Sequence, residues 1–432
     1  MNKNIEQIQI KLFNIEIGII AYDTVKAVSY FQYSQSFLNS NKYKNIFPFI
    51  IKRIPQIQVF KNTDDVFRNL PSVFADSLPD SFGNQLFNIW ADLNKIDPSK
   101  LTPIHQLGYL GNRAMGALEF YPAKVLFKDV NNINLNDINN ILNKVLQSKE
   151  NVSNLKLDEL GLLNIIKMGF SAGGARAKVI VSEHKITKEL IPGDINISDN
   201  YNHFLVKFPK INDKYNRELV EYSYYKSAID SNIDMMPTKL IENKYFTTKR
   251  YDRQHGKKIH VLTASGISGL AFNNKNNDKL SYNNLFKIAN EINISPKDMQ
   301  QLFARMVFNY TFHNIDDHFK NHSFMYNENN DRWTITPAYD INYSLDALAK
   351  WHNAPHNLSL YGKRNDIKTS DILRLATEYN IKKPKKIIRE IYKVSLKWKS
   401  LAIKLNIPMN VIDSIQKDFK NYNKDLKKGL KI

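Results

Sequence analysis

Acidic and amide side chains with a spacing suited to phosphoryl transfer lie in the segment NIDDHFKNHSFMY, residues 314–326. Asp316 is followed after four residues by Asn321. This is the spacing of the protein-kinase catalytic loop, where the Asp orients the attacking hydroxyl and the Asn holds magnesium. Asp340, in PAYDINYS, follows 19 positions later as a candidate second ligand, and oxygen ligands suit Mg²⁺ because it is a hard cation. The same spacing also occurs in polar loops and helix caps. A catalytic role for these residues therefore requires further groups elsewhere in the chain that bind the nucleotide.

Upstream segments supply the partners that nucleotide-dependent phosphoryl transfer requires. The small residues of FSAGGARAKVIV predict a loop whose backbone N–H groups approach phosphate. Lys207 lies in the apolar strand FLVKFP, and Glu221 on the next helix is predicted to form an ion pair with it, with Glu218 one turn earlier as the alternative. The order of these groups along the chain is that of a protein kinase, although HRD, DFG and APE motifs are absent.

The elements that must position these groups divide the chain into an α/β half and a helical half. Strands are predicted at 15–23, 28–33, 204–209 and 245–253, and helices at 81–93, 217–230, 282–292, 296–313, 371–379 and 385–405. The pattern predicts an α+β protein with a two-lobed, protein-kinase-like fold. An extra N-terminal subdomain is expected over 1–128, a kinase N-lobe over 150–252 and an all-helical C-terminal lobe over 253–432. The Asn-rich stretch between the first two parts, 131–150, is predicted to be a linker around a short helix.

Composition narrows the class of protein without identifying its reaction. The 432 residues include 61 Lys and Arg against 42 Asp and Glu, which gives a formal charge of +19, and no Cys. From Asn380 to Ile432 there are 15 basic and 4 acidic residues, so 11 of the 19 excess charges lie in this C-terminal part. The basic surface favours an anionic partner such as nucleic acid, or is simply a solvated set of Lys-rich helices. The absence of Cys fits a reducing compartment, and no apolar run is long enough to span a membrane, so we expect a cytoplasmic protein without a membrane partner.

Seven motifs, in chain order, resemble those of the HipA family of serine/threonine kinase toxins from bacterial type II toxin–antitoxin modules. They are SLPDSFGNQL, LGYLGNRAMGALEFYP, FSAGGARAK, FLVKFP, KRYDR, NIDDHFKN and PAYDI. The resemblance implies a HipA-like fold, ATP and Mg²⁺ as cofactors, Asp316 as the catalytic residue, and Asn321 and Asp340 as the metal ligands. The ATP-binding residues that it implies are Gly173, Gly174, Ala175, Arg176, Ala177, Lys178, Lys207, Lys249, Arg250, Tyr251, His318, Phe319, Lys320, Asn321, Tyr339 and Asp340.

The resemblance also implies how the kinase would be controlled. Ser171 matches the serine that these kinases autophosphorylate. A phosphate group on it would carry about −1.5 to −2 charges, which disfavours the conformation in which the SAGGARAK loop lies against the phosphate pocket. The departure from the family pattern is Lys249, where a glutamate is expected, so the adenine contacts differ there. The implied partners are a HipB-type helix-turn-helix antitoxin, operator DNA through that complex, and a protein substrate, an aminoacyl-tRNA synthetase, whose phosphorylation arrests translation and growth.

Two other functions fit part of the pattern. A small-molecule phosphotransferase of similar fold also uses an Asp-x4-Asn loop, but it would lack the N-terminal motifs and the SAGGARAK loop. A basic DNA-binding corepressor with a decayed kinase site fits the charge, but Lys207, Asp316, Asn321 and Asp340 are all intact.

Overall fold

A computed structural model describes residues 5–62, 64–97, 100–123, 132–147, 176–193, 198–210, 213–274, 276–349 and 354–429. The predicted site residues Ser171, Gly173, Gly174 and Ala175 lie outside this set.

The N-terminal part is built on a five-stranded antiparallel sheet with the strand order β4-β3-β2-β1-β5. Its strands are β1 (Ile5–Leu12), β2 (Ile15–Asp23), β3 (Val28–Tyr33), β4 (Gln58–Phe60) and β5 (Leu118–Tyr121). Alternate residues of β1, namely Ile8, Ile10 and Leu12, are buried, as expected for a strand with one face against a core. The helices of this part are α1 (Gln35–Asn39), α2 (Ser72–Ala75), α3 (Ser81–Leu93) and α4 (Pro103–Leu110). Asp80 begins α3, because its side chain accepts a hydrogen bond from the backbone N–H of Gly83.

A second five-stranded antiparallel sheet follows, with the order β7-β6-β8-β10-β9. Its strands are β6 (Lys178–His184), β7 (Leu190–Pro192), β8 (Tyr201–Lys207), β9 (Thr238–Ile241) and β10 (Tyr245–Lys249). Helix α7 (Arg217–Asp230) packs against β9 and β10. Part of the expected linker is an ordered helix, α5 (Leu135–Gln147), which buries Leu135, Ile138 and Leu142 and whose Asn136 bonds the Tyr245 hydroxyl.

The expectation of an all-helical C-terminal lobe is wrong. Helices do dominate this part: α8 (Ala264–Ser268), α9 (Tyr282–Glu291), α10 (Pro296–Thr311), the 3₁₀ turn η3 (Phe319–Asn321), α11 (Thr369–Glu378), α12 (Pro384–Lys404) and α13 (Met409–Gly429). A three-stranded sheet, β13 (Val261–Thr263), β14 (Ser323–Asn327) and β15 (Arg332–Ile335), lies among them, and β11 (Arg253–Gln254) pairs with β12 (Lys257–Lys258). The aromatic and β-branched segments SFMY and RWTI, separated by a polar Asn-rich turn, form a hairpin that is too short to stand out in a helical pattern.

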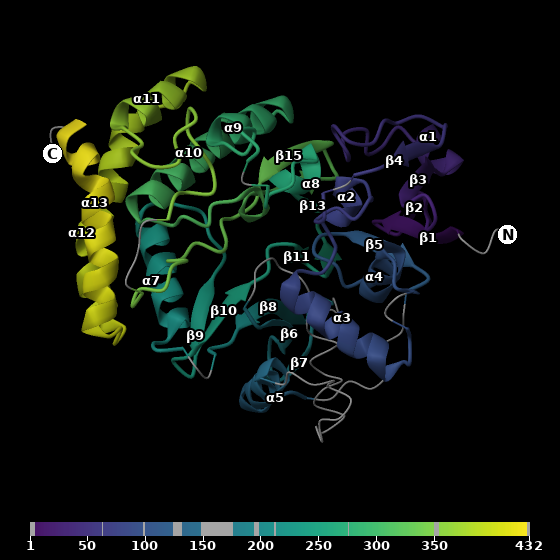
Figure 1. Cartoon of the computed structure of the whole chain (residues 1–432), viewed down its shortest axis with the longest axis horizontal. Helices are drawn as coiled ribbons and strands as arrows, with labels where there is room; N and C mark the ends of the chain where they lie inside the picture. The colour runs from purple at the N-terminus through teal and green to yellow at the C-terminus, as the bar shows by residue number, and fades with distance from the viewer. Residues whose placement is uncertain are drawn as a thin grey trace.

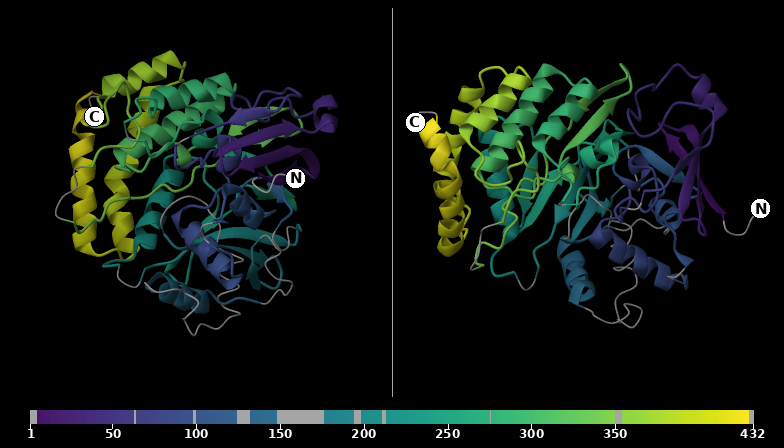
Figure 2. Two further views of the ribbon diagram at one scale, coloured as in Figure 1. Left: turned by 45° about the vertical axis from the view of Figure 1, so that its right-hand side comes forward. Right: turned by 45° about the horizontal axis from the view of Figure 1, so that its top comes forward.

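The two ends of the chain lie at opposite ends of the molecule. Figures 1 and 2 show the β1–β5 sheet at one end and helices α12 and α13 at the other, with the second sheet and α7 between them. Helix α12 packs on α7, α10 and α13, so the C-terminal helices continue the core of the second sheet. None of the described helices is both long enough and apolar enough to cross a membrane.

Candidate active site

A buried lysine joins the two parts of the chain that carry the predicted chemistry. Lys207 ends β8, and its Nζ lies 2.7 Å from Oε1 of Glu221 on α7 and 2.6 Å from Oδ1 of Asp340. Burial alone would lower the pKa of Lys207, but the two carboxylates outweigh it and raise the pKa above its ordinary value, so the lysine stays charged. The structure therefore brings Lys207 and Glu221 together. Glu218, the alternative partner, instead accepts a hydrogen bond from Arg176 at 2.8 Å.

The two candidate metal ligands face one small cavity. Asn321 and Asp340 both line it, together with Asp317 and His322. The amide nitrogen of Asn321 donates to the backbone oxygen of Asp316 at 2.7 Å, which leaves its amide oxygen as the ligand atom. Burial works to raise the pKa of Asp340, but the ammonium groups of Lys207 and Lys178 outweigh it and hold that pKa below its ordinary value. An ionised carboxylate and an amide oxygen fit Mg²⁺, which usually takes one or two protein ligands and completes its shell with phosphate and water.

Asp316 lies at the edge of the same region. Its side chain is 45% exposed, and its Oδ1 lies 3.6 Å from Nε2 of His318. The pKa of Asp316 is raised, first by desolvation and then by the carboxylates of Asp340 and Asp317, while His318 and Lys207 act in the opposite direction. A carboxylate with a raised pKa is a stronger base, which suits a group that accepts a proton from a hydroxyl.

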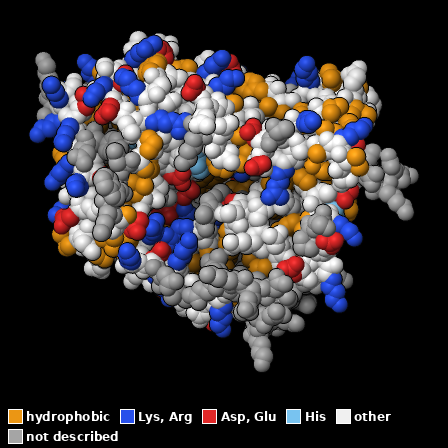
Figure 3. Space-filling view, viewed as in Figure 1, with side chains coloured by type: hydrophobic (Ala, Val, Ile, Leu, Met, Phe, Trp, Pro, Cys, Tyr) orange, Lys and Arg blue, Asp and Glu red, His pale blue; other side chains and the backbone are white. Residues whose placement is uncertain are grey.

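The cleft beside these groups has apolar walls and a charged end. Its apolar lining is Met115, Leu205, Met235, Met236, Phe246 and Val261, and its charged lining includes Lys178, Lys207, Glu221, Lys320 and Asp340. Figure 3 shows acidic side chains in the hollow near the middle of one face, with basic side chains beside them. Apolar walls that lead to convergent cations match a ligand with a flat apolar group at one end and a polyanion at the other.

Three predicted residues form one edge of the cleft at the point where β10 ends. Lys249, Arg250 and Tyr251 all line it. The guanidinium of Arg250 is held by Asp252, which accepts from its Nε at 2.9 Å and from its Nη2 at 2.8 Å. Arg250 is therefore part of the scaffold of this edge.

The remaining predicted residues divide into two groups. Lys178, Lys320, Tyr339 and Asp340 line the cleft, and the Tyr339 hydroxyl donates to the backbone oxygen of Lys320 at 2.7 Å. The side chains of Ala177 and Phe319 are buried in the hydrophobic core and neither residue is among those that line the cleft, so their contacts with ATP remain predictions. His318 does not line it either; its ring packs on Phe272, with the ring centroids 4.9 Å apart.

The N-terminal part contributes a wall of the cleft that the chemical pattern did not predict. Asp76, Ser77 and Met115 line it. Asp76 accepts hydrogen bonds from the backbone N–H and the hydroxyl of Thr263, both at 2.7 Å. Lys178 pairs with Asp80, with Nζ 3.1 Å from Oδ2, and both side chains are buried. Ser77 and Asp80 lie in the turn-rich motif SLPDSF, which Asp76 directly precedes, and Met115 lies in GNRAMG. Both motifs are visible in the sequence, but only the fold shows that they reach the cleft.

A buried aspartate fastens the second N-terminal motif to the edge of the cleft. Oδ2 of Asp252 accepts hydrogen bonds from the backbone N–H of Gly116 and from Nη1 of Arg253, both at 2.8 Å. Arg253 also donates to the backbone oxygens of Gly116 at 2.8 Å and Ala114 at 2.9 Å. Burial alone would raise the pKa of Asp252, but the guanidinium groups of Arg250 and Arg253 hold it well below its usual range. These bonds fix Met115 in the wall of the cleft.

Two protein-family models match this chain, and together they cover most of it. A model of the HipA N-terminal domain matches residues 8–121, and a model of the HipA-like C-terminal domain matches residues 170–398, more than half of the chain. These matches define a protein with both HipA domains. The chain belongs to the HipA family. No curated protein sequence matches it.

A solved structure shows the same fold. The chain is similar to one in the Shewanella oneidensis MR-1 toxin–antitoxin complex of HipA, HipB and operator DNA, with a TM-score of 0.65, 14% identity, and coverage of 98% of this chain and 99% of that chain. A weaker likeness, with a TM-score of 0.42, is to the Helicobacter pylori proinflammatory kinase CtkA, at 15% identity over 61% of this chain and 92% of that chain.

Proposed function

We propose that this protein is a HipA-type toxin kinase that transfers the γ-phosphate of ATP to a serine of a protein substrate. The observation that carries the proposal is the arrangement of Lys207 between Glu221 and Asp340, 2.7 and 2.6 Å away, at the charged end of an apolar-walled cleft. Eight of the residues that the family resemblance implies for ATP binding line this cleft, which supports the proposal: Lys178, Lys207, Lys249, Arg250, Tyr251, Lys320, Tyr339 and Asp340. A lysine held by two carboxylates has a fixed position from which to meet the phosphates of a nucleotide.

Each group of the site has a part in the transfer. Asp316 orients the serine hydroxyl and accepts its proton as the bond between the serine Oγ and the γ-phosphorus forms and the bond to the ADP oxygen breaks. Lys207 and Lys178 offset the negative charge of the phosphates. Asn321 and Asp340 are the residues that would hold Mg²⁺, which when bound neutralises phosphate charge.

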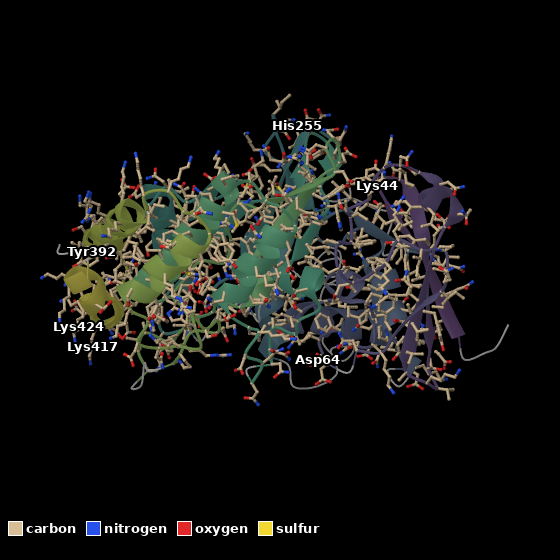
Figure 4. All side chains as sticks on the ribbon, turned by 90° about the horizontal axis from the view of Figure 1, so that it is seen from above. Lys44, Asp64, His255, Tyr392, Lys417 and Lys424 are labelled. Atoms are coloured by element: carbon tan, nitrogen blue, oxygen red, sulfur yellow. The ribbon has the colours of Figure 1, made fainter. Side chains whose placement is uncertain are left out.

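The partners and the control of the kinase are also proposals. The solved complex contains a HipB protein and operator DNA, which supports a HipB-type antitoxin and operator DNA as partners of this chain. The basic C-terminal helices offer a surface for either one: Lys417 and Lys424 lie at the end of the molecule away from Lys44 (Figure 4). Autophosphorylation of Ser171 and an aminoacyl-tRNA synthetase as substrate rest on the family resemblance.

A measurement of ATP binding with and without Mg²⁺ distinguishes a functional kinase site from a decayed one. We expect the purified chain to bind ATP more tightly with Mg²⁺ than without it, and Asp340→Asn to remove that difference. ATP binding that does not respond to Mg²⁺ would favour a decayed site. Phosphoproteomics after brief induction, with the wild type beside Asp316→Asn, would then identify the substrate as a serine phosphorylated by the wild type alone.

A further inference from the structure

A segment distant in sequence holds the carboxylate of Asp316. Between Asp340 and helix α11 the chain returns to the catalytic loop, where the side-chain nitrogen of Asn357 donates to Oδ1 of Asp316 at 3.1 Å. The same nitrogen also donates to the backbone oxygen of Ile315 at 3.0 Å. One amide thus ties the side chain of Asp316 to the backbone of its own loop.

Asn357 is itself fixed by a buried carboxylate. The side chain of Asp317 is fully buried, and its Oδ1 accepts from the backbone N–H of Asn357 at 2.9 Å and of Leu358 at 3.3 Å. Its Oδ2 accepts from the hydroxyl of Tyr282 at 2.8 Å and lies 3.0 Å from Nδ1 of His356. A buried carboxylate with donors on both oxygens is a rigid anchor, because breaking any of these bonds leaves a buried polar group unsatisfied.

The consequence concerns the orientation of Asp316. Its side chain is 45% exposed, so packing alone does not fix the rotation of the carboxyl group. A donor on Oδ1 leaves Oδ2 as the oxygen that faces a substrate hydroxyl. A base that accepts a proton must lie within hydrogen-bonding reach in the right orientation, and loss of that orientation slows the chemical step more than it weakens binding of the nucleotide.

We propose that Asn357 is a positioning residue for phosphoryl transfer: it orients the carboxylate of Asp316, and Asp317 holds Asn357 in place. The inference rests on the proposed kinase function and adds to it a residue outside the motifs that carry the family resemblance. Asn357 acts through Asp316, so it should affect the rate of transfer and not the affinity for ATP.

The test measures transfer and binding separately. Phosphatase-treated protein is given saturating ATP and Mg²⁺, the initial rate of phosphate incorporation is followed by mass spectrometry, and the dissociation constant for ATP is measured by calorimetry. We expect Asn357→Ala to transfer about 10–100-fold more slowly, since general base catalysis as a whole contributes about 10²–10⁴-fold. The KM and Kd for ATP should stay within about twofold of the wild-type values. Asn365→Ala, an exposed change in the same segment, should match the wild type in both measurements.

A second variant separates positioning from folding. Asn357→Asp keeps the size of the side chain but replaces the donor with a carboxylate beside Asp316, so we expect a loss of rate at least as large as that of Asn357→Ala, in a protein that still unfolds cooperatively and binds ATP with the wild-type Kd. Wild-type rates in both variants, or losses of ATP affinity in proportion to rate, would overturn the inference while leaving the kinase function intact. A wild-type chain that transfers no phosphate overturns the kinase function and the inference with it.

Discussion

Nζ of Lys207 lies 2.6 Å from Oδ1 of Asp340, across the cleft between the second sheet and the helical C-terminal part. The two residues are 133 positions apart, and the contact sets the distance between β8 and the loop that carries Asp340, a candidate metal ligand. Glu221 approaches the same ammonium group from α7, so three elements meet at one cation. A change at this lysine therefore tests the cleft as a whole.

Lys207→Met should weaken ATP binding. A hydrogen bond to a charged group is worth about 1.5–3 kcal/mol, so we expect the dissociation constant for ATP with Mg²⁺ to rise about 10–100-fold in calorimetry. The variant also leaves Glu221 and Asp340 without their shared cation, so the free energy of unfolding should fall by about 3–5 kcal/mol. The exposed Lys214→Met is the matched control, and equal ATP affinity in the two variants would contradict the assigned role of Lys207.

Asp252→Asn should destabilise the fold. Asp252 is fully buried between the guanidinium groups of Arg250 and Arg253 and accepts the backbone N–H of Gly116, so the substitution leaves two buried cations without a carboxylate. We expect a loss of about 3–5 kcal/mol in urea unfolding, against less than about 0.5 kcal/mol for the exposed Asp278→Asn. A loss as small as that of the control would show that this network does not join the N-terminal part to the cleft.

Acid should destabilise the protein through His260. This residue is fully buried against Phe47, Tyr326 and Trp333, and desolvation lowers its pKa from 6.5 to about 3. Below pH 6.5 the unfolded chain binds a proton that the folded chain does not take up until about pH 3. As the pH is lowered through this interval, His260 should therefore reduce the free energy of unfolding by about 1.4 kcal/mol for each pH unit.

The comparison for this prediction is between two histidine variants. His260→Phe removes the buried imidazole. The difference in unfolding free energy between wild type and variant should therefore change by about 1.4 kcal/mol per pH unit between pH 6 and pH 4. His255, an exposed histidine labelled in Figure 4, serves as the control, because His255→Asn should leave the pH dependence unchanged. Parallel pH curves for wild type and His260→Phe would argue against a neutral buried imidazole.

Binding to DNA should depend on the basic surface of α13 and on salt. Each phosphate contact releases counterions, so the logarithm of the affinity falls with the logarithm of the salt concentration by about 0.9 per contact. We expect Lys417→Gln combined with Lys424→Gln to weaken binding of duplex DNA and to reduce that slope by about 2. An unchanged slope in a fluorescence anisotropy titration would show that this surface does not contact DNA.

The residues of the chemical site could be predicted because each lies in a local pattern that the sequence displays. The Asp-x4-Asn spacing, the lysine in an apolar strand and the glutamate on the following helix are readable within a few residues, and their order restricts the fold. The structure then places the ammonium group of Lys207 within hydrogen-bonding distance of both Glu221 and Asp340.

What could not be predicted depends on contacts between distant segments. Met115 reaches the cleft because Asp252 holds its loop through Gly116, 136 positions earlier, and Asn357 reaches Asp316 from 41 positions away. No local pattern encodes either contact. The strands of the C-terminal part were missed for a different reason: β13, β14 and β15 have only three to five residues each, too few for a period-two pattern to stand out among long helices.

The most direct test of the kinase function is autophosphorylation of the purified chain. Phosphatase-treated wild type, Asp316→Asn and Asp278→Asn are incubated with ATP and Mg²⁺ and analysed by peptide mass spectrometry, with ATP binding measured in parallel. We predict that the wild type and Asp278→Asn each acquire a phosphate on Ser171, whereas Asp316→Asn acquires none and still binds ATP. Phosphate on Ser171 of Asp316→Asn at the wild-type level, or its absence from all three proteins, would contradict the account.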